Sequence, residues 1–143
     1  MRHRVSSKRL KRTSGELKAL LVNQSKQLIV RGSVTTTLPK AKLLRPFAEK
    51  LITNAKEHNF NNVKRAKAVL VDDEVVRVLF EQVAPKFLER AGGYTRIVKL
   101  ANRPGDNALK ARIEFVEAIK PQPTKTEEKP KIIKAKAKKD AKD

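Results

Sequence analysis

Residues 90–115 read RAGGYTRIVKLANRPGDNALKARIEF, and this order of residue types predicts the end of a helix, a strand, a tight turn and a second strand. Gly92 and Gly93 can both adopt positive φ, which allows the preceding helix to end in a left-handed cap. Tyr94 then begins the first extended run. The glycine pair is therefore predicted to be the turn that leads from a helix into a sheet.

A second turn is expected at Arg103-Pro104-Gly105-Asp106. Pro104 and Gly105 occupy the central positions of a type II turn, where the first residue has a fixed φ and the second a positive φ. Residues 109–115 then alternate apolar with charged side chains, which is the pattern of a half-buried antiparallel strand. Three arginines lie along the stretch, namely Arg90, Arg96 and Arg103. We expect a rigid corner that holds these guanidinium groups against an anionic partner.

The charge of the chain points to a polyanionic partner. Its 143 residues include 34 Lys and Arg against 15 Asp and Glu, which gives a formal net charge of +19. Such an excess opposes compaction unless a partner neutralises it, and nucleic acid rewards clustered cations through counterion release. A membrane surface would also attract this charge, but the sequence has no bulky aromatic interfacial face and no run of about 20 apolar residues. The absence of Cys suits the reducing cytoplasm and excludes disulfides and thiolate-bound metals.

Three regions differ in composition. Residues 1–12 have six basic side chains and no acid, so we expect an arm that is disordered until it meets a polyanion. Residues 13–118 carry periodic apolar positions and form one predicted domain, which is itself basic, with 19 Lys and Arg against 11 Asp and Glu. Residues 119–143 are rich in Pro, Lys, Thr and Glu and predict a disordered tail. The basic side chains of the arm are Arg2, Arg4, Lys8, Arg9, Lys11 and Arg12.

Capping signals predict the first two helices. Thr13-Ser14-Gly15-Glu16 has the pattern of a capping box, and Arg31-Gly32 places a cation and then a glycine at the end of that helix. Residues 33–37 are mostly β-branched and predict a short strand. Thr37 then caps a second helix, with Pro39 in its first turn. The outer side of this helix, near its start, carries Lys40, Lys42 and Arg45.

Two more helices are expected before the glycine pair. The third covers about residues 63–71 and has Lys64 and Arg65 on its surface. The acidic residues 72–74 admit a metal site, but we favour a cap for the fourth helix because acids stabilise helix N-termini. Pro85 is expected to kink that fourth helix, since it removes a backbone donor.

An enzymatic function has little support in the sequence. His3 and His58 are the two histidines, and neither has a second histidine or a carboxylate at a spacing that would form a helical ligand pair. Gly92 and Gly93 follow a helix and precede a strand, which is the reverse of the order in a phosphate-cradling loop. The chain also lacks a Walker pattern and a nucleophile elbow. We therefore expect a binding protein without catalytic residues, cofactor or metal.

The kind of binding can be narrowed to folded RNA. Aromatic residues make up 4% of the chain, which is too few for a platform that stacks single-stranded bases. No recognition-helix pair or zinc-finger spacing indicates sequence reading in a DNA major groove. A basic body with basic extensions suits RNA, where phosphates of several helices converge and shape is recognised. A general nucleic-acid binder, such as an architectural DNA protein, is the competing hypothesis.

Four blocks of sequence resemble the bacterial large-subunit ribosomal protein seventeen family. They are Met1-Arg2-His3-Arg4, Thr36-Thr37-Leu38-Pro39-Lys40-Ala41-Lys42, Glu49-Lys50-Leu51-Ile52-Thr53, and Arg90-Ala91-Gly92-Gly93-Tyr94-Thr95-Arg96-Ile97 with Gly105-Asp106-Asn107-Ala108. The resemblance covers residues 1 to about 118. It implies a structural protein of the large subunit of cytoplasmic ribosomes, monomeric beside neighbouring ribosomal proteins. It further implies contact with large-subunit rRNA near the polypeptide exit region, with the arm threaded into the RNA.

The expected fold is α+β, with about four helices packed on a three-stranded sheet. The resemblance implies that this sheet is mixed and that its strands lie near 33–37, 94–101 and 109–117. The predicted rRNA-binding residues are Arg2, His3, Arg4, Lys8, Arg9, Lys11, Arg12, Lys40, Lys42, Arg45, Lys64, Arg65, Arg90, Arg96 and Arg103. The predicted turn residues are Gly92, Gly93, Pro104 and Gly105.

Overall fold

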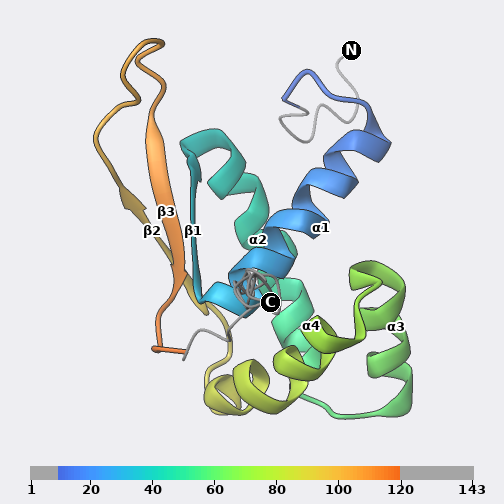
Figure 1. Ribbon diagram of the computed structural model, residues 1–143. Helices are drawn as coiled ribbons and strands as arrows, with labels where there is room; N and C mark the ends of the chain where they lie inside the picture. Colours follow the sequence, from blue (N-terminus) through green and yellow to red (C-terminus); the bar gives the residue numbers. More distant parts are fainter. Residues whose placement is uncertain (1–9, 120–143) are drawn as a thin grey trace, which may run out of the picture.

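Helices pack on one face of a single three-stranded sheet and leave its other face open (Figure 1). The computed structural model describes residues 10–119, so the predictions for Arg2, His3, Arg4, Lys8, Arg9 and residues 120–143 lie outside the described residues. The elements in chain order are α1 (Ser14–Arg31), β1 (Ser33–Thr37), α2 (Leu38–Ala55), α3 (Phe60–Leu70), α4 (Asp73–Val78), the π-helical turn η1 (Leu79–Val83), the 3₁₀ turn η2 (Ala84–Phe87), β2 (Thr95–Lys99) and β3 (Lys110–Phe115). The predicted α+β class is confirmed.

The sheet has the order β1-β3-β2, and β3 pairs antiparallel with both neighbours. The prediction of a mixed sheet is therefore wrong. β1 and β2 run in the same direction, but β3 separates them, so no parallel pair forms. The two longer predicted strands also end earlier than expected, because the chain leaves the ladder after Lys99 and Phe115.

The predicted capping box begins α1. The Thr13 amide donates to a Glu16 carboxylate oxygen at 3.0 Å, and the Glu16 amide donates back to the Thr13 hydroxyl at 3.4 Å. Gly32 ends the helix with φ +75°, a conformation that favours glycine. A Cβ at Gly32 would also lie 3.3 Å from the carbonyl oxygen of Ile119, so the last described residue approaches the helix end closely.

The second and third helices form close to where the sequence places them. Thr37 precedes α2 in an extended conformation, but its side chain makes no capping hydrogen bond. Pro46 lies within α2, which continues to Ala55. α3 begins at Phe60, three residues earlier than predicted, with Asn59 as its extended cap residue.

The fourth predicted helix changes type along its length. Asp72 accepts a hydrogen bond from the Val75 amide at 3.4 Å, so its predicted capping role is confirmed. Pro85 has no amide to donate, and the chain before it widens into η1, where the Ala84 amide reaches the Leu79 carbonyl. The expected kink is thus a π-helical turn followed by a 3₁₀ turn.

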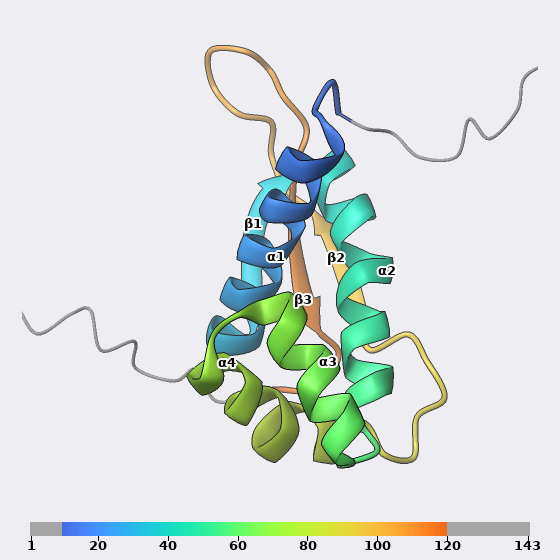
Figure 2. The same cartoon turned by 90° about the vertical axis from the view of Figure 1, so that its right-hand side faces the viewer.

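The core lies between the helices and the inner face of the sheet (Figure 2). Ile113 of β3 is completely buried, as are Leu28 of α1 and Leu44 of α2. Tyr94 is 1% exposed just before β2, and its ring packs on Phe87 with 5.3 Å between centroids. The buried set also includes Ile119, the first residue of the predicted tail.

The two predicted turns differ in outcome. Gly93 has φ +66°, but it lies in a loop after η2, whose cap residue Leu88 is right-handed. The glycine pair therefore does not provide a left-handed helix cap. Gly105 has the predicted positive φ, +99°, and lies in a connection that runs from residue 100 to residue 109.

Candidate nucleic-acid interface

Three segments that carry predicted RNA contacts gather at one end of the molecule (Figures 1 and 2). They are the chain before α1, the first turn of α2 and the connection between β2 and β3. The predicted contacts in these segments are Lys11, Arg12, Lys40, Lys42 and Arg103. We call this set the basic end. It brings together cations from positions about 90 residues apart in the sequence.

Within the basic end, the lysines and Arg103 are held differently. Lys40 and Lys42 have no ion-pair partner among the described residues. Arg103 forms a two-point contact with Asp106, with Nε–Oδ1 at 2.9 Å and Nη2–Oδ2 at 2.5 Å. The hydrogen bond from Arg103, with that from the Ala108 amide, lowers the pKa of Asp106 to about 2. A phosphate that binds Arg103 must therefore share this side chain with the Asp106 carboxylate or displace the carboxylate from it.

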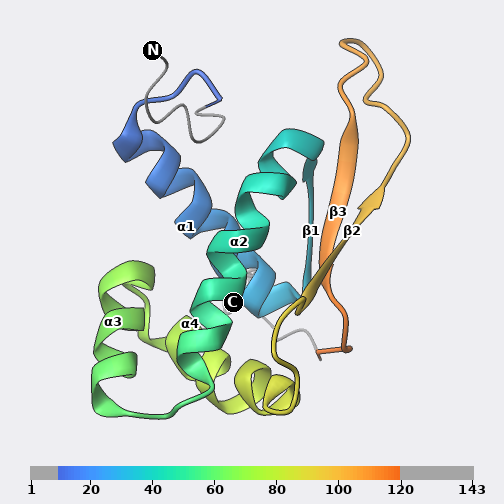
Figure 3. The same ribbon diagram turned by 180° about the vertical axis from the view of Figure 1, so that it is seen from behind.

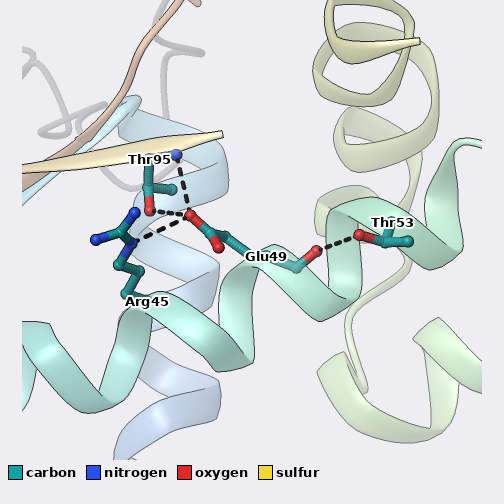
Figure 4. A network of polar contacts seen from close by, with 4 residues as sticks. All are labelled: Arg45, Glu49, Thr53 and Thr95. Carbon is teal, nitrogen blue, oxygen red and sulfur yellow. Dashed lines mark hydrogen bonds and ion pairs between the residues drawn. The ribbon is translucent and has the colours of Figure 1, made fainter. Parts of the chain in front are cut away.

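Arg45 lies further along α2 in a network of polar contacts (Figure 4). Its Nε is 3.4 Å from Oε1 of Glu49, the same oxygen that accepts the Thr95 hydroxyl at 3.0 Å and the Thr95 amide at 3.4 Å. Thr53 donates to the backbone carbonyl of Glu49 at 3.0 Å. Glu49 thus links α2 to β2 and holds Arg45 at the surface beside that link.

The predicted corner of three arginines does not form. β2 runs from the loop beside η2 to the connection at the basic end, so Arg90 and Arg103 lie beyond opposite ends of this strand (Figure 3). Arg96 lies on β2 between them. An extended strand carries the chain about 3.3 Å per residue, which separates the two ends even though the sequence positions are close.

Lys64 and Arg65 lie exposed on α3, far from the basic end (Figure 1). Phe60 begins the same helix and is 82% exposed. Two acids beside this helix are already paired, because Lys67 contacts Asp73 at 2.8 Å and Lys26 contacts Asp72 at 3.8 Å. The acidic stretch therefore acts as a cap and as an ion-pair partner.

The open face of the sheet carries a basic residue that sequence reasoning missed. Arg112 of β3 lies beside Arg96 of β2, and both contact Glu114, at 2.5 Å and 2.6 Å respectively. The alternation of Lys110, Arg112 and Glu114 with apolar residues already indicated that these side chains share one face. This alternation predicts the strand, but it does not by itself indicate that the charged side chains form a binding site.

The described residues show neither a metal site nor a membrane span. Among residues 10–119, no group of three or more His, Asp or Glu side chains is arranged to hold a metal ion. In the same range, no helix is long and apolar enough to cross a bilayer. His58 is exposed, and its ring packs edge-on against Phe80 with centroids 5.1 Å apart.

Comparison with known proteins gives one consistent family. The family model described as ribosomal protein L17 matches residues 20–116. The chain is 51% identical over 118 residues to the large ribosomal subunit protein bL17 of a Sulfurihydrogenibium species, which covers 82% of this chain and 98% of that protein. It is 48% identical over 117 residues to the protein of the same name from Akkermansia muciniphila, covering 82% of this chain and 86% of the relative.

Proposed function

Because this chain belongs to the ribosomal protein L17 family, we propose that it binds and stabilises folded large-subunit rRNA near the polypeptide exit region. The family is a structural class of ribosomal proteins, and the relatives are named as components of the large subunit. The proposed partners are large-subunit rRNA and neighbouring large-subunit proteins, with the chain present as a monomer. The proposal assigns no catalytic step to any residue.

The observation that carries the RNA proposal is the basic end. Lysines at the start of α2 have no ion-pair partner among the described residues and lie on the same end as the chain before α1. Residues 1–12 precede α1 in the sequence and carry six basic side chains. In the proposal, the arm becomes ordered on RNA while the domain formed by residues 13–118 docks beside it. Residues 119–143 are proposed to be a basic tail, whose first residue, Ile119, packs in the core.

The first experiment locates the protein in cells. A tagged full-length copy is expressed in bacteria and sedimented through a gradient at moderate and then at high salt. We expect it to migrate with the large subunit at both salt concentrations, because an assembled component is held by buried contacts as well as by screened charges. Free migration at moderate salt, or association with DNA, contradicts the proposal.

The second experiment tests the basic end directly. The double variant Lys40→Ala/Lys42→Ala is expected to bind a large-subunit rRNA transcript about tenfold more weakly. The slope of log affinity against log salt concentration should become shallower by about two, because each replaced lysine removes one phosphate contact. Arg77→Ala is the matched control, because Arg77 is 76% exposed on α4 and pairs with Glu81 of the adjoining turn η1, away from the basic end. Equal losses in the variant and the control would contradict a role specific to the basic end.

A further inference from the structure

The open face of the sheet carries a cluster of charged side chains that are joined by ion pairs. The register places Glu114 of β3 between Ser33 of β1 and Arg96 of β2. Arg112 is two residues earlier on β3, so its side chain leaves the sheet on the same side. No helix covers this side of the sheet in any view of the described residues (Figures 1 and 3). The cluster is therefore open to a partner.

Glu114 holds the two arginines without using all their donors. Its Oε1 accepts from Nε of Arg96 at 2.6 Å, and its Oε2 contacts Nη2 of Arg112 at 2.5 Å. Each guanidinium group carries five N–H donors, and two arginines together offer more donors than the single Glu114 carboxylate can accept, so both can also bind a partner. The Glu114 side chain is only 10% exposed, whereas those of Arg96 and Arg112 are 61% and 49% exposed. The nearly buried carboxylate thus holds two arginine side chains that are about half exposed.

A third arginine lies at the same place. Arg31, in the last turn of α1, lines an open groove of about 280 Å³ together with Arg96 and Arg112. Glu114 and Glu117 line it as well, so three arginines and two glutamates border the groove. Arg31 has no ion-pair partner among residues 10–119. Its charge is therefore not neutralised by an ion pair within this range.

The fixed geometry of this cluster suits a phosphodiester. Guanidinium groups bind phosphate oxygens through parallel hydrogen bonds, and they do so best when their orientation is already set. The hydrogen bond from Arg96, with a contribution from Arg112, lowers the pKa of Glu114, which shows that the two arginines favour the ionised carboxylate. Lysines on flexible stems, such as those of the basic end, lack this preorganisation.

We propose that Arg31, Arg96 and Arg112 form a second phosphate-binding site for the RNA backbone on the open face of the sheet. Glu114 is its positioning residue, because it acts on phosphate only through the two arginines. This inference rests on the proposed RNA-binding function and adds a surface to it. The chain would then contact RNA through the basic end and also through the open face of the sheet, where the strand register aligns Arg96 with Glu114.

The test uses the full-length chain and separates the effect of the arginine charges on RNA affinity from the effect of the guanidinium geometry. Arg96→Lys/Arg112→Lys keeps both charges and removes both guanidinium forks, whereas Arg96→Ala/Arg112→Ala removes both charges. We expect each double variant to bind a large-subunit rRNA transcript at least tenfold more weakly than the wild-type chain. In the alanine variant, the slope of log affinity against log salt concentration should also become shallower by about two. In the lysine variant, which keeps both charges, this slope should stay the same.

Controls separate this site from the proposed function. Circular dichroism establishes that each variant is folded, and Arg77→Ala supplies an exposed arginine away from the sheet. Binding of both double variants within twofold of wild type would overturn the second site, even if Lys40→Ala/Lys42→Ala weakens binding. Failure of the wild-type chain to bind the transcript would instead overturn the RNA-binding function.

The role of Glu114 has a separate readout. Glu114→Gln removes the ionised anchor and leaves all three arginines in place. If Glu114 positions them, the preference for rRNA over duplex DNA at the same salt concentration should fall about fivefold, because loosened guanidinium groups still attract any polyanion. A gain in rRNA affinity with an unchanged preference would show that Glu114 only competes with phosphate, and this would overturn its positioning role.

Discussion

The two faces of the sheet are made from the same three strands but serve different purposes. On the inner face, Ile113 is completely buried among helix side chains. On the outer face, its neighbours Arg112 and Glu114 form ion pairs beside solvent. The chain alternates between these environments at each residue, because successive side chains of a strand point in opposite directions. The inner face therefore determines stability, and the outer face is free to determine binding.

The largest effect is expected from a truncation on the inner face. Ile113→Ala should lower the free energy of unfolding by about 3 kcal/mol, because it removes buried methyl groups and leaves a cavity between α2 and the sheet. Urea denaturation followed by circular dichroism measures this loss. Val98→Ala is the control on the outer face of β2, where the side chain is 40% exposed and the cost should be below about 1 kcal/mol. Similar costs for the two variants would break the comparison.

A smaller effect is expected where the inner face contains a polar contact. Thr95 is 3% exposed, and its hydroxyl donates to Glu49 at 3.0 Å across the boundary between β2 and α2 (Figure 4). Thr95→Val should cost about 1.5 kcal/mol, since a hydrogen bond to a charged group is lost with little change in shape. Thr35→Val on the exposed side of β1 should change stability by less than about 0.5 kcal/mol. Thermal or urea unfolding of both variants sharpens the contrast between the faces.

The local parts of this architecture could be predicted from the sequence. The capping box at Thr13, the cap at Asp72 and the positive φ of Gly105 depend on neighbouring residues, and all three form as expected. The alternation of residues 109–115 also identified a half-buried strand. Each of these signals acts over a few residues, which is why residue types and spacing suffice to reveal it.

The parts that depend on strand order and register could not be predicted. The contact between Arg96 and Glu114 joins residues 18 positions apart, and it exists because β2 pairs with β3 in one particular register. The expectation of a mixed sheet failed for a related reason, since the position of β3 between the other strands is a tertiary choice. The corner of arginines failed because a strand separates Arg90 from Arg103.

The smallest effect concerns the ion pairs of the outer face and their dependence on pH. Hydrogen bonding from Arg96 lowers the pKa of Glu114 in the folded chain below its value of about 4.3 in an unfolded one. A carboxyl group with a depressed pKa stabilises the fold above the unfolded pKa, and this contribution is lost as the pH falls through the folded pKa. It should be less than about 1 kcal/mol, because both arginines are about half exposed.

The measurement is the difference in unfolding free energy between the wild-type chain and Glu114→Gln from pH 7 to pH 3. We expect the wild type to be slightly more stable at pH 7 and the difference to shrink below about pH 4, where a protonated Glu114 resembles glutamine. The comparison with one variant removes the contribution of other acids, such as Asp106, that titrate in the same range. A difference that does not vary with pH would mean that the outer ion pairs do not stabilise the fold. In that case the free energy of unfolding would depend on the buried inner face and not on the ion pairs of the outer face.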